Sequence, residues 1–309
     1  MTTSSPSLNP PSALRRSLPL ALLLGALVVL GLGLWFSSGD ARVWWQVVAL
    51  GVVEGLTEFL PISSTAHLLI AADLLGFQNS IGGTFEIFIQ LGAVLAVLGY
   101  YARDLTAQAR AIPNSAEARR FWMHVAVAFV PAAVVGLLLR DWIKAVLFES
   151  PQLIATTLIL GGIVLLAIEL LPRRAPTTTD AQRVTFRQAL AVGLVQILAL
   201  VPGVSRSGSA LVGGMLSGMD RSSATTFSFY LAIPTLGLAT LVDLLGSLDQ
   251  IQTDDIGRLA VGALVSFVVA WLSIGWLLRY VATNRFVGFG IYRIAAGLVI
   301  LALVAAGAL

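Results

Sequence analysis

The sequence predicts an all-α polytopic membrane protein, in which two inverted-topology repeats follow an extra N-terminal transmembrane helix. The first observation is composition: 57% of the 309 residues are hydrophobic and 11% are charged, whereas a soluble domain has about 25% charged residues. The second is that two long apolar stretches are interrupted by proline and small polar residues. The third is a likeness between the two halves of the chain.

Seven apolar runs are long enough to span a membrane. The run Ser17–Phe36 carries no charge and lacks a small-residue cleavage site, which favours an uncleaved helix over a signal peptide. Further spans are expected near residues 84–101, 121–139, 153–171, 225–245, 257–278 and 287–308, since about 20 helical residues cross a hydrocarbon core. We therefore expect a tail and extra helix over 1–40 and a single membrane domain over 41–309.

Two other apolar stretches, 43–76 and 188–218, predict re-entrant helical hairpins. The first breaks at Pro61 in LPISSTAH, and the second at Pro202 in VPGVSRSG. Proline removes a helical hydrogen bond, and a serine or threonine can cap the helix that restarts after it. Non-helical backbone at membrane depth is tolerated only where protein or a watery cavity surrounds it. The breaks are therefore expected to be buried and to line a site.

The two hairpins belong to two similar halves. Leu50–Ser64 aligns with Val192–Ser205 when one gap is allowed, and Thr84–Phe88 aligns with Thr226–Tyr230. Each half contains a hairpin and then three spanning helices, over about 43–171 and about 188–308. Because three is an odd number, the second repeat must be inverted relative to the first.

The loop charges agree with this topology and exclude some partners. Basic residues gather in the loops placed in the cytoplasm, and acidic residues 249, 254 and 255 lie in a loop placed outside. Short basic clusters between apolar runs indicate a membrane surface and not nucleic acid as the partner. The absence of cysteine excludes disulfides, thiolate metal sites and cysteine nucleophiles.

The first hairpin holds four reactive side chains within EGLTEFLPISSTAH. Glu54 and Glu58 share one helix face, and Ser64 and His67 share a face after the break. Intramembrane carboxylates are costly and usually mark function. A pair of them predicts a divalent cation, Mg²⁺ or Ca²⁺, on Glu54 and Glu58. The alternative is that both glutamates lie at an aqueous interface, or are protonated and hydrogen-bonded.

The second hairpin, PGVSRSG, is suited to phosphate. Arg206 can grip phosphate with two parallel hydrogen bonds, and a helix that starts near Ser205 points its positive end at the break. The alternative is that Arg206 pairs with a buried glutamate for structural reasons. The expected substrate-binding residues are Ser63, Thr65, Gln90, Gly203, Ser205, Ser207 and Gly208.

Other polar residues in apolar runs are expected to have roles outside the chemistry of the site. His124 is expected at the membrane interface, and Glu86 and Gln90 share a face that could line the cavity. Snorkelling from helix ends accounts for Glu169, Asp243 and Arg293.

Glu54–His67 and Pro202–Gly208 resemble the two signatures of the undecaprenyl pyrophosphate phosphatase family, also called BacA or UppP, the bacitracin-resistance proteins. Phe85–Val97 and Phe227–Pro234 are similar to the family as well, and the resemblance runs from about residue 43 to the C-terminus. One departure is Ala66, where the family commonly has glycine.

This resemblance implies hydrolysis of undecaprenyl pyrophosphate to undecaprenyl phosphate and inorganic phosphate, which recycles the lipid carrier of cell-wall synthesis. It implies a bacterial inner-membrane enzyme whose site faces the periplasm or cell exterior. Glu54 and Glu58 would act as metal ligands or base, Ser64 and His67 as nucleophile and acid/base, and Arg206 as phosphate ligand. The attacking group stays open among Ser64, His67 and water.

A transporter or flippase for a polyprenyl phosphate or another anion is the alternative function, because inverted repeats with broken helices are typical of secondary transporters. The Ser64–His67 pair discriminates, since hydrolysis needs reactive side chains and transport does not. The partners expected are the polyprenyl pyrophosphate substrate and membrane lipids. A homodimer is compatible with the sequence, which is silent on oligomeric state, cation and prenyl chain length.

Overall fold

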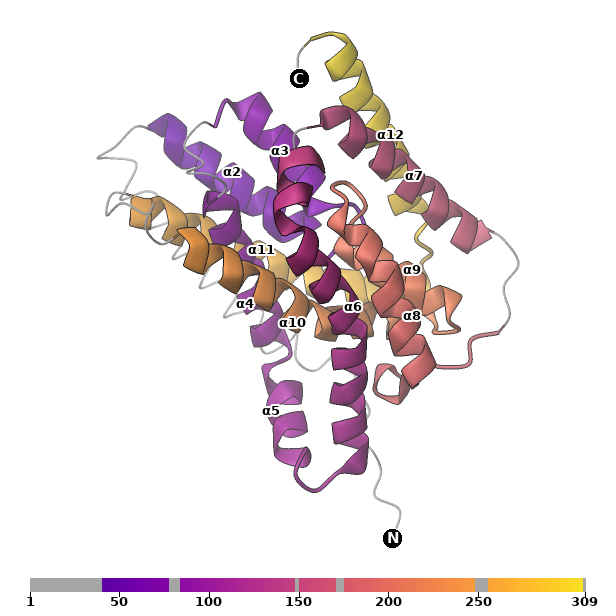
Figure 1. Ribbon diagram of the computed structural model, residues 1–309. Coiled ribbons are helices and arrows are strands. Elements are labelled where there is room, and N and C mark those ends of the chain that lie inside the picture. The colour runs from indigo at the N-terminus through magenta and orange to yellow at the C-terminus, as the bar shows by residue number, and fades with distance from the viewer. Residues whose placement is uncertain (1–40, 78–83, 148–149, 171–174, 248–254, 308–309) are drawn as a thin grey trace.

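The computed structural model describes residues 41–77, 84–147, 150–170, 175–247 and 255–307 (Figure 1). Within these residues the protein is helical, and the β pairing is limited to an isolated bridge between Thr178 and Met219. The extra helix predicted at Ser17–Phe36 lies outside the described residues. The all-α class is confirmed for the part of the chain that the structure describes.

Both predicted hairpins are present. The first consists of α2 (Ala41–Thr57) and α3 (Ser64–Leu75), which pack against each other. The second consists of α8 (Phe186–Gln196), the short 3₁₀ turn η2 (Ile197–Leu200) and α9 (Arg206–Leu216). Helix α8 starts at a capping box, in which the Thr185 and Gln188 side chains each accept a hydrogen bond from the other residue's backbone N–H.

Each of the six spans predicted after residue 40 corresponds to a long helix. These are α4 (Thr84–Tyr100), α6 (Ala116–Leu147), α7 (Pro151–Leu170), α10 (Arg221–Ser247), α11 (Ile256–Thr283) and α12 (Val287–Ala305). Among the described residues, all of these except α4 are long and apolar enough to cross a membrane by themselves. Helix α4 continues into α5 (Ala102–Ala111) through a 64° bend. The chain is therefore a multi-pass membrane protein.

The two hairpins lie within the body of the molecule. Helix α11 packs against α2 and α4, α6 packs against α8, and α10 contacts α4, α6 and α9. Helices α7 and α12 pack along each other (Figure 1). Residues of the first break, including Phe59 and Ile62, belong to the main hydrophobic core, and Pro202 and Gly203 of the second break are buried. The prediction that both breaks are buried is confirmed.

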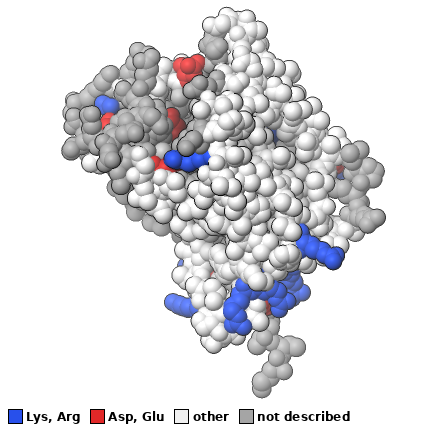
Figure 2. Space-filling view, viewed as in Figure 1, with Lys and Arg blue, Asp and Glu red and all other residues white. Residues whose placement is uncertain are grey.

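Much of the surface that the structure describes is apolar. Large aliphatic side chains such as Leu138, Leu170 and Leu216 are exposed on the helices, as expected of surfaces that face lipid. Helices α5 and the start of α6 project from the lower end in Figure 1, and basic side chains gather over them in Figure 2. The exposed arginines of this region are Arg103, Arg110, Arg119 and Arg120.

Candidate active site

Both breaks end at a serine with unusual backbone geometry. Ser63 has a φ of 72° and caps α3, and Ser205 has a φ of 79° and caps α9. Among the described residues these are the positions other than glycine with positive φ. Such geometry costs about 1–3 kcal/mol and persists only where the surroundings hold it. The caps pair Ser63, and not Ser64, with Ser205, so the hairpins correspond without the gap allowed in the sequence alignment.

Arg293 on α12 holds the two breaks together. Its side chain is 1% exposed. Nη1 donates to the carbonyl oxygens of Pro61 and Val204, each at 3.0 Å, so one nitrogen joins the two breaks. Nη2 donates to the Gly203 carbonyl at 2.9 Å. The remaining contacts are Nη2 with the carbonyls of Val204 at 3.0 Å and Thr157 at 3.3 Å, and Nε with that of Leu158 at 3.3 Å.

The expectation that Arg293 snorkels from a helix end is wrong. The carbonyls in the breaks have lost their helical N–H partners and need buried donors, and a guanidinium supplies five N–H groups in a fixed plane. One signal in the sequence could have found it. Arg293 is the sole charged residue of α12, and an ionisable side chain inside an apolar span usually has a buried function.

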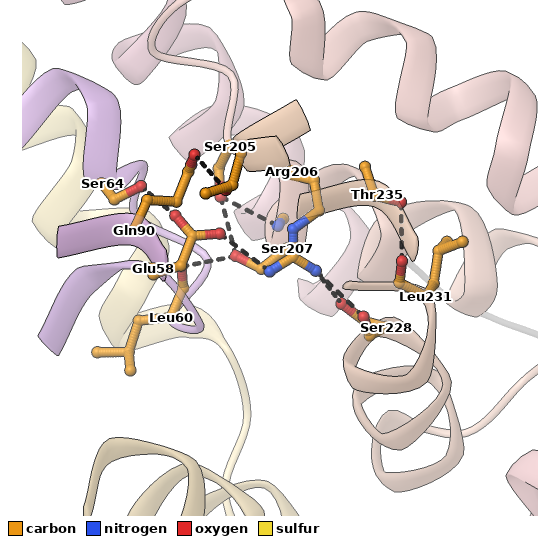
Figure 3. A network of polar contacts seen from close by, with 12 residues as sticks. Glu58, Leu60, Ser64, Gln90, Ser205, Arg206, Ser207, Ser228, Leu231 and Thr235 are labelled. Atoms are coloured by element: carbon orange, nitrogen blue, oxygen red, sulfur yellow. Dashed lines mark hydrogen bonds and ion pairs between the residues drawn. The ribbon is translucent and has the colours of Figure 1, made fainter. Parts of the chain in front are cut away.

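Glu58 is the acceptor at which the two hairpins meet (Figure 3). Ser64 Oγ donates to Glu58 Oε2 at 2.5 Å, and Arg206 Nη2 lies 3.1 Å from Glu58 Oε1. The Glu58 side chain is 4% exposed and that of Arg206 is 10% exposed, so the ion pair is shielded from water. The structure therefore places a hydroxyl and a guanidinium on the same carboxylate, each from a different hairpin.

Arg206 keeps a buried nitrogen without a hydrogen-bond partner among the described residues. Its Nη1 donates to the carbonyl of Ser228 at 3.1 Å, and its guanidinium carbon lies 5.8 Å from the centre of the Phe59 ring. Its Nε–H is buried without a hydrogen-bond partner among the described residues. The pairing of Arg206 with a buried glutamate, weighed above as the alternative, is thus present, and a donor is left over for another anion.

Two serines of the second hairpin tie the breaks together at a further point. Ser207 Oγ donates to the carbonyl of Leu60 at 2.8 Å and lies 3.1 Å from Ser205 Oγ, which accepts from the Gly208 N–H. A side chain on Gly203 would collide with the Thr157 hydroxyl, because an added Cβ would be 2.0 Å away. These residues, predicted to bind substrate, make close contacts within the protein.

The ring nitrogens of His67 lie within hydrogen-bond distance of groups other than Ser64. Its Nδ1 lies 2.7 Å from the carbonyl oxygen of Ser63, and its Nε2 lies 2.8 Å from the hydroxyl of Tyr292 on α12. Of the side chains expected to act as a base, the structure places Glu58 within hydrogen-bond distance of the Ser64 hydroxyl.

Known proteins match this chain over most of its length. The model of the family described as "Bacitracin resistance protein BacA" matches residues 47–299. The chain belongs to the BacA family. It is 48% identical to an undecaprenyl-diphosphatase of Albidiferax ferrireducens, with 85% of this chain and 96% of that protein covered. It is 47% identical to an undecaprenyl-diphosphatase of Deinococcus radiodurans, with 86% and 97% covered.

Glu54 is the unsatisfied acid of this BacA-family site. It is 1% exposed, and neither carboxylate oxygen has a hydrogen-bond partner among the described residues. Gln196 occupies the corresponding place in the second hairpin and is likewise buried without partners there. Within the described residues, no three His, Cys, Asp or Glu side chains group as a ready metal site. Glu54 still fits a hard cation, because Mg²⁺ commonly takes one or two carboxylates and completes its shell with water and phosphate.

The remaining predicted site residues make no hydrogen bond with Glu58, Ser64 or Arg206 among the described residues. Gln90 on α4 accepts a hydrogen bond from Thr240 on α10 at 3.2 Å, and Thr65 is half-buried in the first turn of α3. His124 is buried with Nδ1 2.7 Å from the Val184 carbonyl oxygen, and its position at the membrane interface stays a prediction. The interpretation of Glu169 is wrong. Glu169 is 3% exposed and does not snorkel, because its oxygens accept from Arg221 at 2.5 and 2.7 Å.

We predict that Arg293→Met lowers the melting temperature of the purified protein by several degrees and abolishes turnover. The apolar side chain leaves buried carbonyl groups unpaired, at about 1–3 kcal/mol for each. Arg183→Met is the matched control, because the Arg183 side chain is 68% exposed and its contact with Asp180 is 3.7 Å long. Thermal unfolding in detergent measures the melting temperature of both variants. Equal melting temperatures for the two variants would show that Arg293 does not hold the breaks.

Proposed function

We propose that this protein hydrolyses undecaprenyl diphosphate to undecaprenyl phosphate and inorganic phosphate. The single observation that carries the proposal is the buried Glu58 carboxylate, shared by the Ser64 hydroxyl and the Arg206 guanidinium. A nucleophile, its base and a phosphate ligand are the parts that phosphoryl transfer requires. The relatives named above as undecaprenyl-diphosphatases support the same substrate.

Ser64 is the nucleophile in this proposal. Its Oγ attacks the terminal phosphorus, the bond from that phosphorus to the bridging oxygen breaks, and undecaprenyl phosphate leaves. The hydroxyl proton passes to Glu58 Oε2, which already accepts its hydrogen bond. Water then attacks the phosphoserine, inorganic phosphate leaves, and Ser64 Oγ takes back the proton held by Glu58. The net reaction consumes one water for each diphosphate.

Arg206 couples substrate binding to the activation of Ser64. While it pairs with Glu58, the carboxylate is shared between the guanidinium and the Ser64 hydroxyl. A bound phosphate competes for the same guanidinium and also offers an acceptor to the buried Nε–H. As Arg206 turns to the phosphate, the Glu58 carboxylate is left to accept the Ser64 proton. The same guanidinium then stabilises charge on the transferred phosphoryl group.

A divalent cation would be held by Glu54, whose two oxygens lack other partners among the described residues. A cation there would neutralise charge on the diphosphate. Both oxygens of Glu58 already have hydrogen-bond partners, Ser64 and Arg206. We therefore assign Glu58 the role of base, and Glu54 the role of main metal ligand.

Hydrolysis is favoured over transport by the same contacts. A carrier or flippase needs no hydroxyl hydrogen-bonded to a buried carboxylate, whereas a phosphatase with a serine nucleophile does.

The proposed architecture is a pair of inverted repeats with the site facing the cell exterior. The packing supports it: α2 lies on α11 as α8 lies on α6, and α4 lies on α11 as α10 lies on α6. The exposed arginines of α5 and the start of α6 support a cytoplasmic position for that end. The proposed location is the bacterial inner membrane, with residues 41–309 as one domain.

We predict that Ser64→Ala lowers phosphate release from undecaprenyl diphosphate in detergent by at least about a thousandfold. Wild-type protein incubated with substrate labelled at the terminal phosphate should carry the label on Ser64. Thr106→Ala, which removes an exposed hydroxyl on α5 that donates to the Arg103 carbonyl, is the control and should keep label and activity within a few-fold. A Ser64→Ala variant with near-normal turnover would assign the attack to water or His67.

Metal dependence has a separate test. Excess chelator should abolish turnover by the wild-type protein, and added Mg²⁺ or Ca²⁺ should restore it. Glu54→Gln should require a much higher cation concentration for the same rate, because a neutral amide is a poorer ligand for a hard cation. Full activity in excess chelator would contradict the proposal that Glu54 binds a cation required for turnover.

Topology can be measured by cysteine labelling, because the chain contains no cysteine of its own. Asp73→Cys, at the exposed end of α3, should react with a membrane-impermeant maleimide in intact cells. Arg110→Cys, at the exposed end of α5, should react only after the cells are permeabilised. The reverse pattern would place the site toward the cytoplasm.

A further inference from the structure

Tyr292 on α12 contacts the first hairpin through His67, and it lies outside both sequence signatures. Its hydroxyl is 2.8 Å from His67 Nε2, and the two rings stack with their centres 5.6 Å apart and their planes 10° apart. Tyr292 is 45% exposed, so burial of its ring does not by itself explain the contact.

The hydrogen bonds of His67 define which nitrogen carries the proton. Nδ1 lies 2.7 Å from the carbonyl oxygen of Ser63, and a carbonyl can only accept, so Nδ1 is the protonated nitrogen. Nε2 of the neutral ring then has a lone pair, and the Tyr292 hydroxyl donates to it. The Ser63 carbonyl thereby fixes the tautomer of the imidazole, and the Tyr292 hydroxyl helps to fix its rotation.

His67 in turn holds the strained end of the first break. The Ser63 carbonyl accepts from the His67 ring at 2.7 Å and from the His67 backbone N–H at 3.3 Å. Ser63 has a φ of 72°, and its carbonyl belongs to the peptide group that carries the Ser64 nitrogen. The orientation of that peptide group sets the direction in which Ser64 Oγ points toward Glu58.

Two consecutive residues of α12 therefore support the same break. Arg293 is buried and binds the Pro61 carbonyl at 3.0 Å, and Tyr292 is half-exposed and reaches the Ser63 carbonyl through His67. The first contact fixes where the break lies, and the second fixes the peptide group that precedes the nucleophile.

We propose that Tyr292 is a positioning residue, which acts through His67 and the Ser63 carbonyl to align Ser64 with Glu58. The inference rests on the proposed function, because it requires Ser64 to be the nucleophile. It also gives His67 a part in catalysis without requiring it to take the Ser64 proton.

Tyr292→Phe tests this directly, because it keeps the stacked ring and removes the donor. We expect kcat for undecaprenyl diphosphate to fall about 5- to 10-fold, as for the loss of one hydrogen bond, with KM unchanged within about twofold. The matched control is Tyr280→Phe, which removes a hydroxyl that donates to the Arg285 carbonyl at 3.2 Å. The control should keep the wild-type kcat.

A double-mutant cycle separates positioning from general stability. If Tyr292 acts through His67, then Tyr292→Phe should cause no further loss of kcat in the His67→Ala background. Equal additional losses in both backgrounds, or a wild-type kcat for Tyr292→Phe alone, would overturn the inference and leave the proposed function standing. Wild-type protein that releases no phosphate would overturn the proposed function and this inference with it.

Discussion

The contact of Arg293 with both helix breaks is the constraint on which the rest of the site depends. Each proline break frees carbonyl groups that water cannot reach, and buried carbonyls without donors are costly. A single guanidinium, 1% exposed, donates to the carbonyls of Pro61, Gly203 and Val204. Because the two breaks share one donor, they must lie next to each other. Two hairpins far apart in sequence thus form one site.

The charges of the site follow from that proximity. Glu58 from the first hairpin would be an uncompensated buried carboxylate if Arg206 from the second did not lie 3.1 Å away. The same carboxylate accepts from the Ser64 hydroxyl. Substrate phosphate can therefore leave the Glu58 carboxylate to the Ser64 hydroxyl alone by competing for Arg206. In this account binding and activation are the same event, because one residue serves both.

Much of this arrangement could be predicted from the sequence, since its signals are local. Proline with small polar residues indicated the breaks, apolar runs indicated the spans, and Glu58, Ser64 and Arg206 stood out as polar groups in apolar stretches. Contacts between α12 and the hairpins could not be predicted. Arg293 donates to the Pro61 carbonyl although the two lie 232 positions apart in the sequence. No local periodicity or motif indicates which residues so far apart in the sequence will be in contact. The pairing of His67 with Tyr292 instead of Ser64 was missed for the same reason.

The central claim is that Glu58 and Arg206 work as one unit across the two hairpins. A double-mutant cycle on kcat/KM, with Glu58→Gln, Arg206→Gln and the double variant, measures it most directly. Because each residue acts through the other, the account predicts that the double variant loses little more activity than either single variant. Multiplicative losses, with the double variant worse by the product of the two, would mean that the hairpins contribute independently and would contradict the account.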